Sequence, residues 1–385
     1  MKKLNLKSFI YFFALLIFVL FLGIFLKQTI QDPPEGVPET EDLQAPEPES
    51  PEPLSDVDEK DEEEQQEEVI QEDEKSSLDL NFLFFGDMML DRYVGKRIDQ
   101  RGLDYIFGPM KEQGVFDSRD LIGANLEGAV THGGQHYPPE HLYDFAFSPE
   151  IVSGIVDDYN FNFFNIANNH LADQGDRGIE ETNENLNDIG VYFSGCEDGV
   201  AGDCSLETVD FGDIEVAFLG FSMVYSIPDE DKMASLIESA ASSSDLVVVN
   251  IHWGVEYEHN FNRIQRKFGQ LFIDNGADMV VGHHPHVIQG MEIYNEKPIF
   301  YSLGNFVFDQ YFSSATQEGF ALEINIQEEE IVYSFKPFVS ENSQVRMITE
   351  DSKKQDFFDN FVNWSNLDEE EEEELFSFRS ISLKR

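Results

Sequence analysis

The chain has 385 residues, of which 41% are hydrophobic and 35 are phenylalanine, so it can bury a sizeable core in one large domain or two smaller ones. Its formal net charge is −51, and residues 32–75 hold 20 acidic residues against two lysines. Because the rest of the chain is also acidic, the composition excludes nucleic acid as a partner and broad binding to anionic lipid headgroups. An anionic substrate would need metal ions or a local cluster of arginine and histidine.

The N-terminus carries a membrane signal. Three lysines in residues 1–8 precede the uncharged apolar stretch 9–26, which at about 1.5 Å per residue nearly spans a hydrocarbon core of about 30 Å. No A-x-A cleavage pattern follows, so residues 9–27 are predicted as a transmembrane signal anchor and not as a cleaved signal peptide. The lysines predict a single-pass cell-membrane protein in which residues 1–8 are cytoplasmic and the chain after the anchor is extracytoplasmic.

The next segment, residues 28–78, is rich in Glu, Asp, Pro and Gln and has too little apolar surface to form a packed core. It is predicted as an acidic disordered linker, an extended tether. A folded domain is then expected over residues 79–340. Residues 341–385 are expected to form a C-terminal helix, at 353–364, and a tail that contains the acidic run 368–374.

Apolar runs alternate with helical patterns through the folded part of the chain. Helices are predicted at 149–158, 175–190, 231–243 and 263–276. Strands are predicted in the runs 78–87, 120–128, 161–170, 214–221, 245–254, 277–286 and 297–306, and a β-hairpin in 320–339. This alternation predicts an α/β fold whose sheet is largely covered on both faces.

Polar side chains stand at or just after the ends of several apolar runs. They are carboxylates, an amide and imidazoles, namely Asp87, Glu127, Asn169, His170, His252 and His283. Ligands of open α/β sheets bind beyond the carboxyl ends of the strands. These ligand types suit a divalent metal, Mn, Zn, Fe or Mg, so the sequence predicts a metal or oxyanion site. The alternative is a cluster of polar residues that satisfy one another.

The two cysteines, Cys196 and Cys204, flank a polar, Gly-rich loop that is predicted to lie outside the cytoplasm. This setting predicts a disulfide that braces the loop. The alternative, a redox or metal-binding pair, lacks the expected spacing.

Six motifs resemble, in order, those of the CapA family of poly-γ-glutamate capsule biosynthesis proteins, whose domain is similar to calcineurin-like metallophosphoesterases. They are GDMMLDR (86–92), GANLEGAVT (123–131), ANNHLADQGDRGI (167–179), VVNIHWGVEYE (248–258), GADMVVGHHPHVIQG (276–290) and IFYSLGNFVFD (299–309). The resemblance covers roughly residues 80–340. It implies a metallophosphoesterase-like layered αββα sandwich.

The same resemblance implies roles for individual residues. The implied metal ligands are Asp87, Glu127, Asn169, His252, His283 and His286, with His284 as an alternative to His286. His170 would protonate a leaving group, and Arg92 would orient a carboxylate or phosphate. His284 and Asn305 are expected beside the ligands or the substrate, and Glu256 at the rim. Met89 stands where the pattern has a histidine, so one metal position lacks a ligand.

Family membership implies a membrane-anchored protein of poly-γ-glutamate synthesis or export, working beside a ligase and small capsule-synthesis membrane proteins. Three functions remain open at this point. The first is a metal-dependent hydrolase that cuts a phosphoester or the amide-linked polymer. The second is a non-catalytic component that binds and guides the polymer. The third is a cell-surface metallophosphatase unrelated to a capsule.

Overall fold

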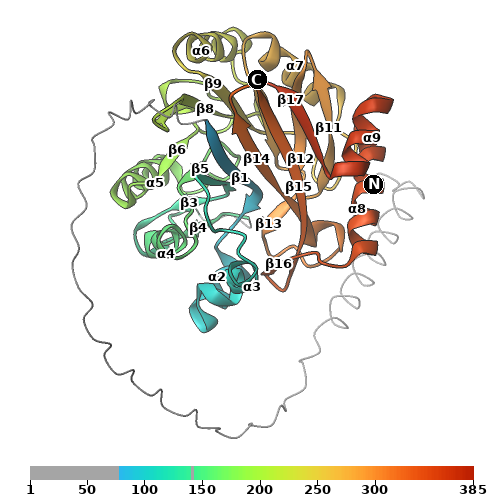
Figure 1. The fold of residues 1–385 in the computed structure, drawn as a ribbon. Helices are drawn as coiled ribbons and strands as arrows, with labels where there is room; N and C mark the ends of the chain where they lie inside the picture. Colours follow the sequence, from blue (N-terminus) through green and yellow to red (C-terminus); the bar gives the residue numbers. More distant parts are fainter. Residues whose placement is uncertain (1–77, 140–142) are drawn as a thin grey trace, which may run out of the picture. The chain divides into compact units, whose positions relative to one another are not determined.

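Two β-sheets lie at the centre of the structure, a computed structural model that describes residues 78–139 and 143–385 (Figure 1). Across the larger sheet the strands are β16 (Gln344–Met347), β15 (Glu330–Glu341), β14 (Glu318–Gln327), β1 (Asp79–Met88), β2 (Leu121–Leu126), β5 (Phe163–Asn165) and β6 (Tyr192–Ser194). Two further strands join it, since β13 (Asn305–Val307) pairs with β1 and β17 (Ser380–Lys384) with β15.

The smaller sheet has six strands. In order across the sheet they are β11 (Ile288–Tyr294), β12 (Lys297–Leu303), β10 (Met279–His283), β9 (Leu246–His252), β8 (Glu215–Ser222) and β7 (Leu206–Asp210). The strands β12, β10, β9 and β8 run parallel, and antiparallel partners close both edges. A separate pair, β3 (Ala129–Val130) and β4 (Ala146–Phe147), lies outside both sheets.

Alternation along β1 shows how the layers form. Phe82 and Phe84 point into a core shared by the two sheets, while Leu83 and Phe85 point to the opposite face. Successive side chains of a strand point to opposite faces of the sheet. A strand that is buried on both faces is therefore apolar at every position, as the run in β1 is. Each fully buried phenylalanine contributes about 2–3 kcal/mol by leaving water.

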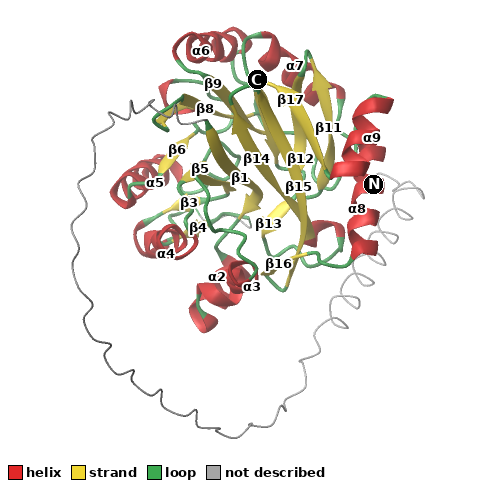
Figure 2. Cartoon of the chain, in the orientation of Figure 1, coloured by secondary structure: helices red, strands yellow, loops and turns green. Residues whose placement is uncertain are grey.

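Helices cover the outer faces of the sheets (Figure 2). On the larger sheet lie α2 (Arg92–Arg101), α3 (Leu103–Glu112), α4 (Pro149–Tyr159) and α5 (Gly175–Ile189), whose buried residues share one core with β1, β2 and β5. On the smaller sheet lie α6 (Glu230–Ser243) and α7 (Arg263–Asp274), which pack on β8, β9 and β10. The predicted α/β sandwich is confirmed.

The amphipathic helix α7 illustrates how the sequence determines where a helix begins and which face it buries. The side chain of Asn262 accepts hydrogen bonds from the backbone N–H groups of Ile264 and Gln265, which caps the helix start. Phe268 and Phe272 then fall one turn apart and enter the core.

The C-terminal segment holds more structure than the sequence analysis predicted. Helix α8 (Asp351–Trp364) covers the predicted 353–364. The acidic run 368–374 lies at the start of a further helix, α9 (Glu369–Phe378), because Asp368 caps it and negative charge suits a helix N-terminus. Strand β17 then returns the chain to the larger sheet.

The predicted anchor, residues 9–27, and nearly all of the predicted linker lie outside the described residues. Within residues 78–139 and 143–385, no helix has the length and apolar character needed to cross a membrane.

Candidate metal centre

Strand register brings polar residues from distant parts of the chain together at the carboxyl ends of the parallel strands. In the larger sheet, Asp87 of β1 is the register partner of Asn125 in β2 and of Asn305 in β13. In the smaller sheet, His283 of β10 is the partner of His252 in β9. The expectation that a site forms beyond these strand ends therefore has a structural basis in the register itself.

A close backbone approach fixes the position of Asp87. Its N–H donates to the carbonyl of Gly304 at 3.0 Å. A Cβ atom on the preceding residue, Gly86, would lie 1.8 Å from the same carbonyl oxygen, so only glycine allows β1 to come so near.

The Asp87 carboxylate is fully buried and surrounded by donors. Nδ1 of His286 lies 3.2 Å away and Nδ1 of His283 lies 3.7 Å away. The Asn125 amide donates to it at 2.8 Å and the backbone N–H of His284 at 3.2 Å. Burial alone would raise the pKa of Asp87, but its hydrogen bond with His286 and the nearby histidines lower that pKa below its usual value. Asp87 is therefore poised as an anion.

Glu127 is the opposite case. It is fully buried, and its Oε2 has no hydrogen-bond partner in the described part of the chain. Burial raises its pKa well above the usual value, and the negative charge of Asp87 raises it further. Two adjacent buried carboxylates stay charged together only when a cation compensates them, so this pair calls for a positive ion or a proton.

His252 connects the two sheets. Its Nε2 lies 2.8 Å from Oδ1 of Asn169, and its Nδ1 lies 3.2 Å from the amide nitrogen of Asn125. Nδ1 of His284 lies 3.1 Å from the same Nε2. Burial and the neighbouring histidines lower the pKa of His252 well below its usual value, so the ring is neutral, the form that binds metals.

The three histidines after β10 sit on an unusual backbone. His284 has φ 97° and His286 has φ 57°, conformations that side chains with a Cβ rarely adopt. Burial lowers the pKa of His283 to about 4 and that of His284 to about 3. Nδ1 of His286 lies 2.9 Å from Oδ1 of Asn305 and 3.2 Å from Oδ2 of Asp87, so two acceptors share its N–H and Nε2 is left for another ligand.

The donor set fits a divalent metal. Asp87, Glu127 and His286 each offer one ligand atom, and these atoms lie within 4.8 Å of one another. The exposed Glu256 forms a second group with His284 and His286, in which the ligand atoms also lie within 4.8 Å of one another. Buried Nδ1 of His283, like Oε2 of Glu127, has no hydrogen-bond partner among the described residues, and carboxylate and imidazole together suit Mn, Zn, Fe or Mg.

His170 lies at a cavity of about 520 Å³ that opens beside these residues. Its Nδ1–H donates to the carboxylate of Asp173 at 2.8 Å, and its ring packs on Phe145 with centroids 4.1 Å apart. The cavity is lined by Arg92, Tyr143, Phe145, Asn169, His170, Tyr225, Glu256, Tyr257, His286, Phe308, Asp309, Gln310 and Phe312. A pocket of this size holds a small ligand or one end of a longer one.

Arg92, the second residue expected to contact substrate, also lines this cavity. Its guanidinium forms a two-point ion pair with Asp309, with Nε 3.0 Å from Oδ2, and lies 4.9 Å from the Phe145 ring centroid. Asp309 therefore holds the fork in place and offsets part of its charge.

The structure also reveals a central residue that the sequence analysis missed. Asn125 is fully buried, and its amide nitrogen contacts Asp87, Glu127 and His252. Its position two residues before Glu127 places it on the same face of the extended chain, which is the signal that could have identified it.

Met89, which stands in place of the expected histidine, is fully buried in the core of the larger sheet. Its sulfur accepts the backbone N–H of Asp91 at 3.1 Å. It thus serves the packing of the β1–α2 turn.

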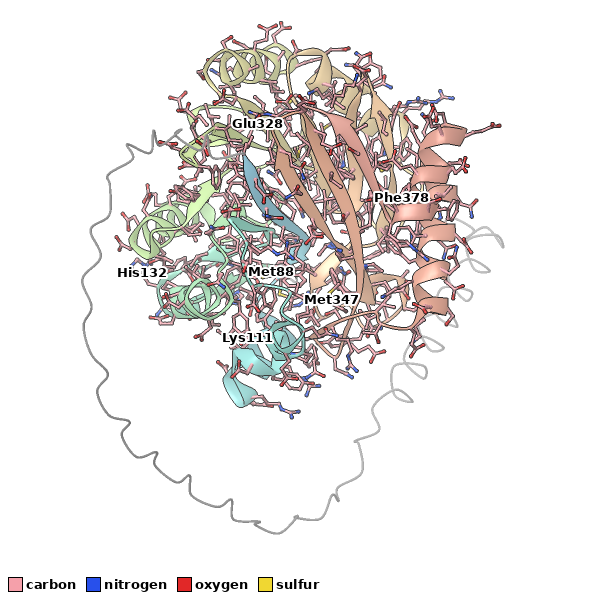
Figure 3. The ribbon with its side chains drawn as sticks, in the orientation of Figure 1. Met88, Lys111, His132, Glu328, Met347 and Phe378 are labelled. Atoms are coloured by element: carbon pink, nitrogen blue, oxygen red, sulfur yellow. A yellow bond between two sulfur atoms is a disulfide. The ribbon has the colours of Figure 1, made fainter. Side chains whose placement is uncertain are left out.

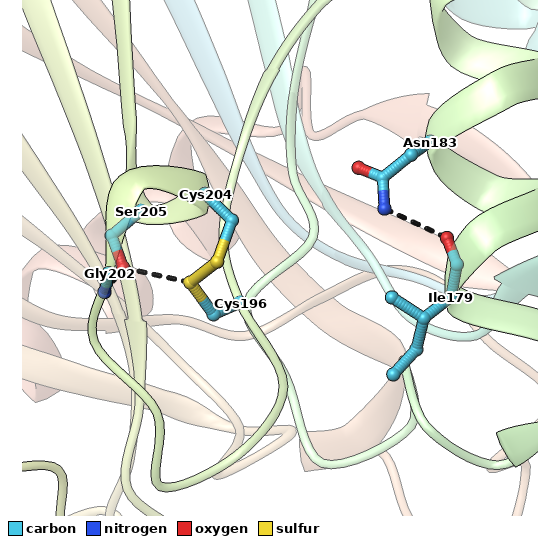
Figure 4. The surroundings of a disulfide bond; sticks show 6 residues. All are labelled: Ile179, Asn183, Cys196, Gly202, Cys204 and Ser205. Carbon is cyan, nitrogen blue, oxygen red and sulfur yellow. Dashed lines mark hydrogen bonds between the residues drawn. A yellow bond between two sulfur atoms is a disulfide. The ribbon is translucent and has the colours of Figure 1, made fainter. Parts of the chain in front are cut away.

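Cys196 and Cys204 form a disulfide, the pairing proposed from the sequence (Figure 4). The Cys196 sulfur lies 3.2 Å from Oγ of Ser205, and the backbone N–H of Gly195 donates to the carbonyl of Cys204. These contacts brace the loop that leads into β7.

Fold and site together define a mixed α/β sandwich protein with a buried carboxylate–histidine centre. The chain belongs to the family described as bacterial capsule synthesis protein PGA_cap, which matches residues 81–310. This membership confirms the resemblance to CapA proteins.

Two curated relatives support the assignment. The chain is 35% identical over 251 residues to the "PGA biosynthesis protein CapA" of Bacillus subtilis (strain 168), covering 60% of this chain and 64% of the relative. It is 30% identical over 258 residues to the "Capsule biosynthesis protein CapA" of Bacillus anthracis, covering 62% and 61%. The match thus spans less than two thirds of either relative.

Among solved structures, a hypothetical protein from Thermus thermophilus aligns with a TM-score of 0.42 and 13% identity, over 70% of this chain and 98% of that one.

Proposed function

We propose that this chain acts in poly-γ-glutamate capsule biosynthesis as a membrane-anchored protein whose extracytoplasmic domain carries a metal-dependent, metallophosphoesterase-like hydrolase site. The observation that carries the proposal is the buried group of Asp87, Glu127 and His286, whose ligand atoms lie within 4.8 Å of one another. The capsule role is supported by the printed names of the two Bacillus relatives. The membrane anchor is supported by the apolar residues 9–26 and the lysines before them.

Asp87, Glu127 and His286 would hold the ion, with His252, His283 and Asn169 as further ligands. When bound, a divalent metal polarises the scissile group and lowers the pKa of a bound water. Asn125 orients Asp87 and Glu127 by donating to both. Asn305 fixes the tautomer of His286 by accepting its Nδ1–H, so that Nε2 faces away from that bond.

His170 is the proton donor of the proposed site. Because its Nδ1–H is held by Asp173, the exchangeable proton is carried at Nε2. His170 lines the cavity with Arg92, whose fixed guanidinium orients a carboxylate or phosphate of the substrate. The aromatic lining, including Phe145 and Phe308, limits water around the reacting bond.

Met89 favours a second candidate function, a non-catalytic component that binds and guides the polymer. With Met89 in the core, one metal position lacks the histidine that two-metal hydrolysis uses. Metal binding would then serve to hold anionic groups rather than to activate water.

His170→Gln separates the two functions. The purified chain, loaded with Mn²⁺ or Zn²⁺, is assayed for cleavage of poly-γ-glutamate and of a simple aryl phosphodiester. A hydrolase loses about 100-fold or more in kcat through His170→Gln while its metal content is unchanged. Asp188→Asn, an exposed change on α5, is the control that keeps full turnover.

The second function predicts a different result: full metal content, no turnover of either substrate by the wild type, and loss of capsule polymer in producing cells that carry Asp87→Asn. Robust phosphodiester cleavage with an unaffected capsule would contradict both capsule functions and favour a cell-surface metallophosphatase.

A further inference from the structure

Helix α2 carries positive charge that the metal centre does not use. Residues 78–385 contain 19 lysines and arginines against 56 aspartates and glutamates. Four of these basic residues fall within the ten residues of α2, namely Arg92, Lys96, Arg97 and Arg101. In a domain that is acidic as a whole, this helix carries a net positive charge.

Three of these residues, here called the α2 basic face, make no ion pair with any carboxylate among the described residues: Lys96, Arg97 and Arg101. They lie over aromatic rings instead. Lys96 is 4.9 Å from the Tyr93 ring centroid, and Arg97 and Arg101 share the Tyr105 ring at 5.9 and 4.1 Å. A ring attracts a cation without neutralising it, so the charge stays available to an anion.

Two nearby carboxylates, Asp99 and Asp104, lower the net positive charge of this region, but neither forms an ion pair with the α2 basic face in the described part of the chain. Asp99 is exposed on the same helix. Asp104, at the start of α3, accepts the hydroxyl of Tyr159 at 2.6 Å. On the neighbouring helix α3, Lys111, labelled in Figure 3, also lies over an aromatic ring, that of Tyr159 at 4.8 Å.

The α2 basic face begins at Lys96, about one helical turn after Arg92, which lines the cavity beside the metal centre. Helix α2 begins at Arg92, which lines the cavity, and extends about 14 Å from it at about 1.5 Å per residue. Burial raises the pKa of Tyr311, and the positive charge of Arg97 acts in the opposite direction, which places Arg97 in the same region as this hydroxyl. Tyr311 belongs to the same segment as Gln310 and Phe312, which line the cavity.

We propose that the α2 basic face binds a linear polymer of carboxylates and guides it toward the cavity at the metal centre. Arg97 and Arg101 stand one helical turn apart, with Lys96 beside them, a spacing that serves successive charges of an extended chain. A small anion needs donors that converge on one point, which three side chains along a helix do not provide. An anionic bilayer would bring the acidic remainder of the domain against like charge, whereas a narrow polymer contacts this face alone.

This inference rests on the proposed capsule function, because that function supplies the polymer. The test measures binding of fluorescently labelled poly-γ-glutamate to the full chain by anisotropy, at low and at physiological salt. The test variant is Lys96→Glu/Arg101→Glu, and the control is Lys232→Glu/Arg263→Glu, an equal charge change at exposed positions on α6 and α7. Arg97 is left in place because it is half-buried.

The inference predicts that the test variant binds the polymer about tenfold more weakly, that the control stays within about twofold of the wild type, and that salt weakens wild-type binding. Equal binding by test and control variants would overturn the role of α2 and leave the capsule function standing. No polymer binding by the wild type would contradict the polymer function itself. Binding of phosphatidylglycerol vesicles in place of polymer, with the same residue dependence, would also overturn the inference.

Discussion

Oδ2 of Asp87 lies 3.2 Å from Nδ1 of His286, which joins the end of a strand in the larger sheet to the loop after a strand in the smaller one. Neither residue is exposed: Asp87 is fully buried and His286 is 3% exposed. Because this contact joins the two sheets, the candidate metal centre forms only when the sheets pack together. A change that shifts either sheet is therefore expected to disturb the centre.

Metal binding should release a proton from Glu127. Its raised pKa means that the metal-free protein holds a proton there until the pH exceeds that value, and a metal must displace it. Metal affinity is therefore expected to fall as the pH drops through the pKa of Glu127. The pKa values of His283 and His284 are about 4 and 3, so both rings are already unprotonated near neutral pH. A metal therefore displaces no proton from them at that pH.

Titration calorimetry in two buffers of different ionisation enthalpy measures that proton. Glu127→Gln should bind metal more weakly and release no proton at this position. Equal proton release by wild type and variant would contradict the role given to Glu127.

Gly86→Ala should both destabilise the fold and weaken metal binding. The added Cβ would lie 1.8 Å from the carbonyl oxygen of Gly304, so β1 must move away and carry Asp87 with it. Strain of this kind costs about 3 kcal/mol in the free energy of unfolding, measured by urea denaturation. Gly108→Ala is the matched control, because its nearest new contact is an ordinary 3.8 Å. Similar losses in the two variants would contradict the argument.

The disulfide should stabilise the fold without serving the centre. Cys196→Ser/Cys204→Ser frees a short loop and is expected to lower the free energy of unfolding by about 2–3 kcal/mol. Metal content, measured on the folded variant, should stay at the wild-type value. A loss of metal would show that the loop also positions the site.

Glu181 should make the free energy of unfolding decrease at acidic pH. Burial would raise its pKa, but hydrogen bonds from His132, Tyr137 and Arg177 lower it to about 2. Because the folded-state pKa lies below the unfolded value, the unfolded chain takes up a proton first as the pH falls. The stabilisation is complete above about pH 4.5 and is lost between there and about pH 2. Glu181→Gln should flatten this part of the curve of unfolding free energy against pH, and an unchanged slope would contradict the assignment.

Much of the fold could be predicted from the sequence because most of its strands and helices have clear local patterns of apolar residues. The run 78–87 became β1, and the pattern 263–276 became α7, since an apolar run or a 3.6-residue period reports burial directly. Helices α2 and α3 were not predicted. Helix α2 buries only Val94 and Ile98, so its periodicity is weak.

The site was harder to predict than the fold. The ligand candidates were found because they follow apolar runs, whereas Asn125 lies within such a run and is marked only by its spacing of two residues from Glu127. Its importance comes from pairing across strands, and Glu256 joins His284 and His286 only through the folding of a loop. The pattern of apolar and polar residues along the sequence does not show which strand ends lie next to one another in the folded sheets.

Metal content of the purified full chain, by elemental analysis after reconstitution with Mn²⁺, Zn²⁺ or Fe²⁺ and removal of excess ion, tests the central claim most directly. Asp87→Asn and His286→Ala are compared with Asp188→Asn as the surface control. The account predicts at least one equivalent of metal in the wild type and the control, and its loss in both site variants. A wild-type protein that stays metal-free, or site variants that retain the full amount, would contradict it.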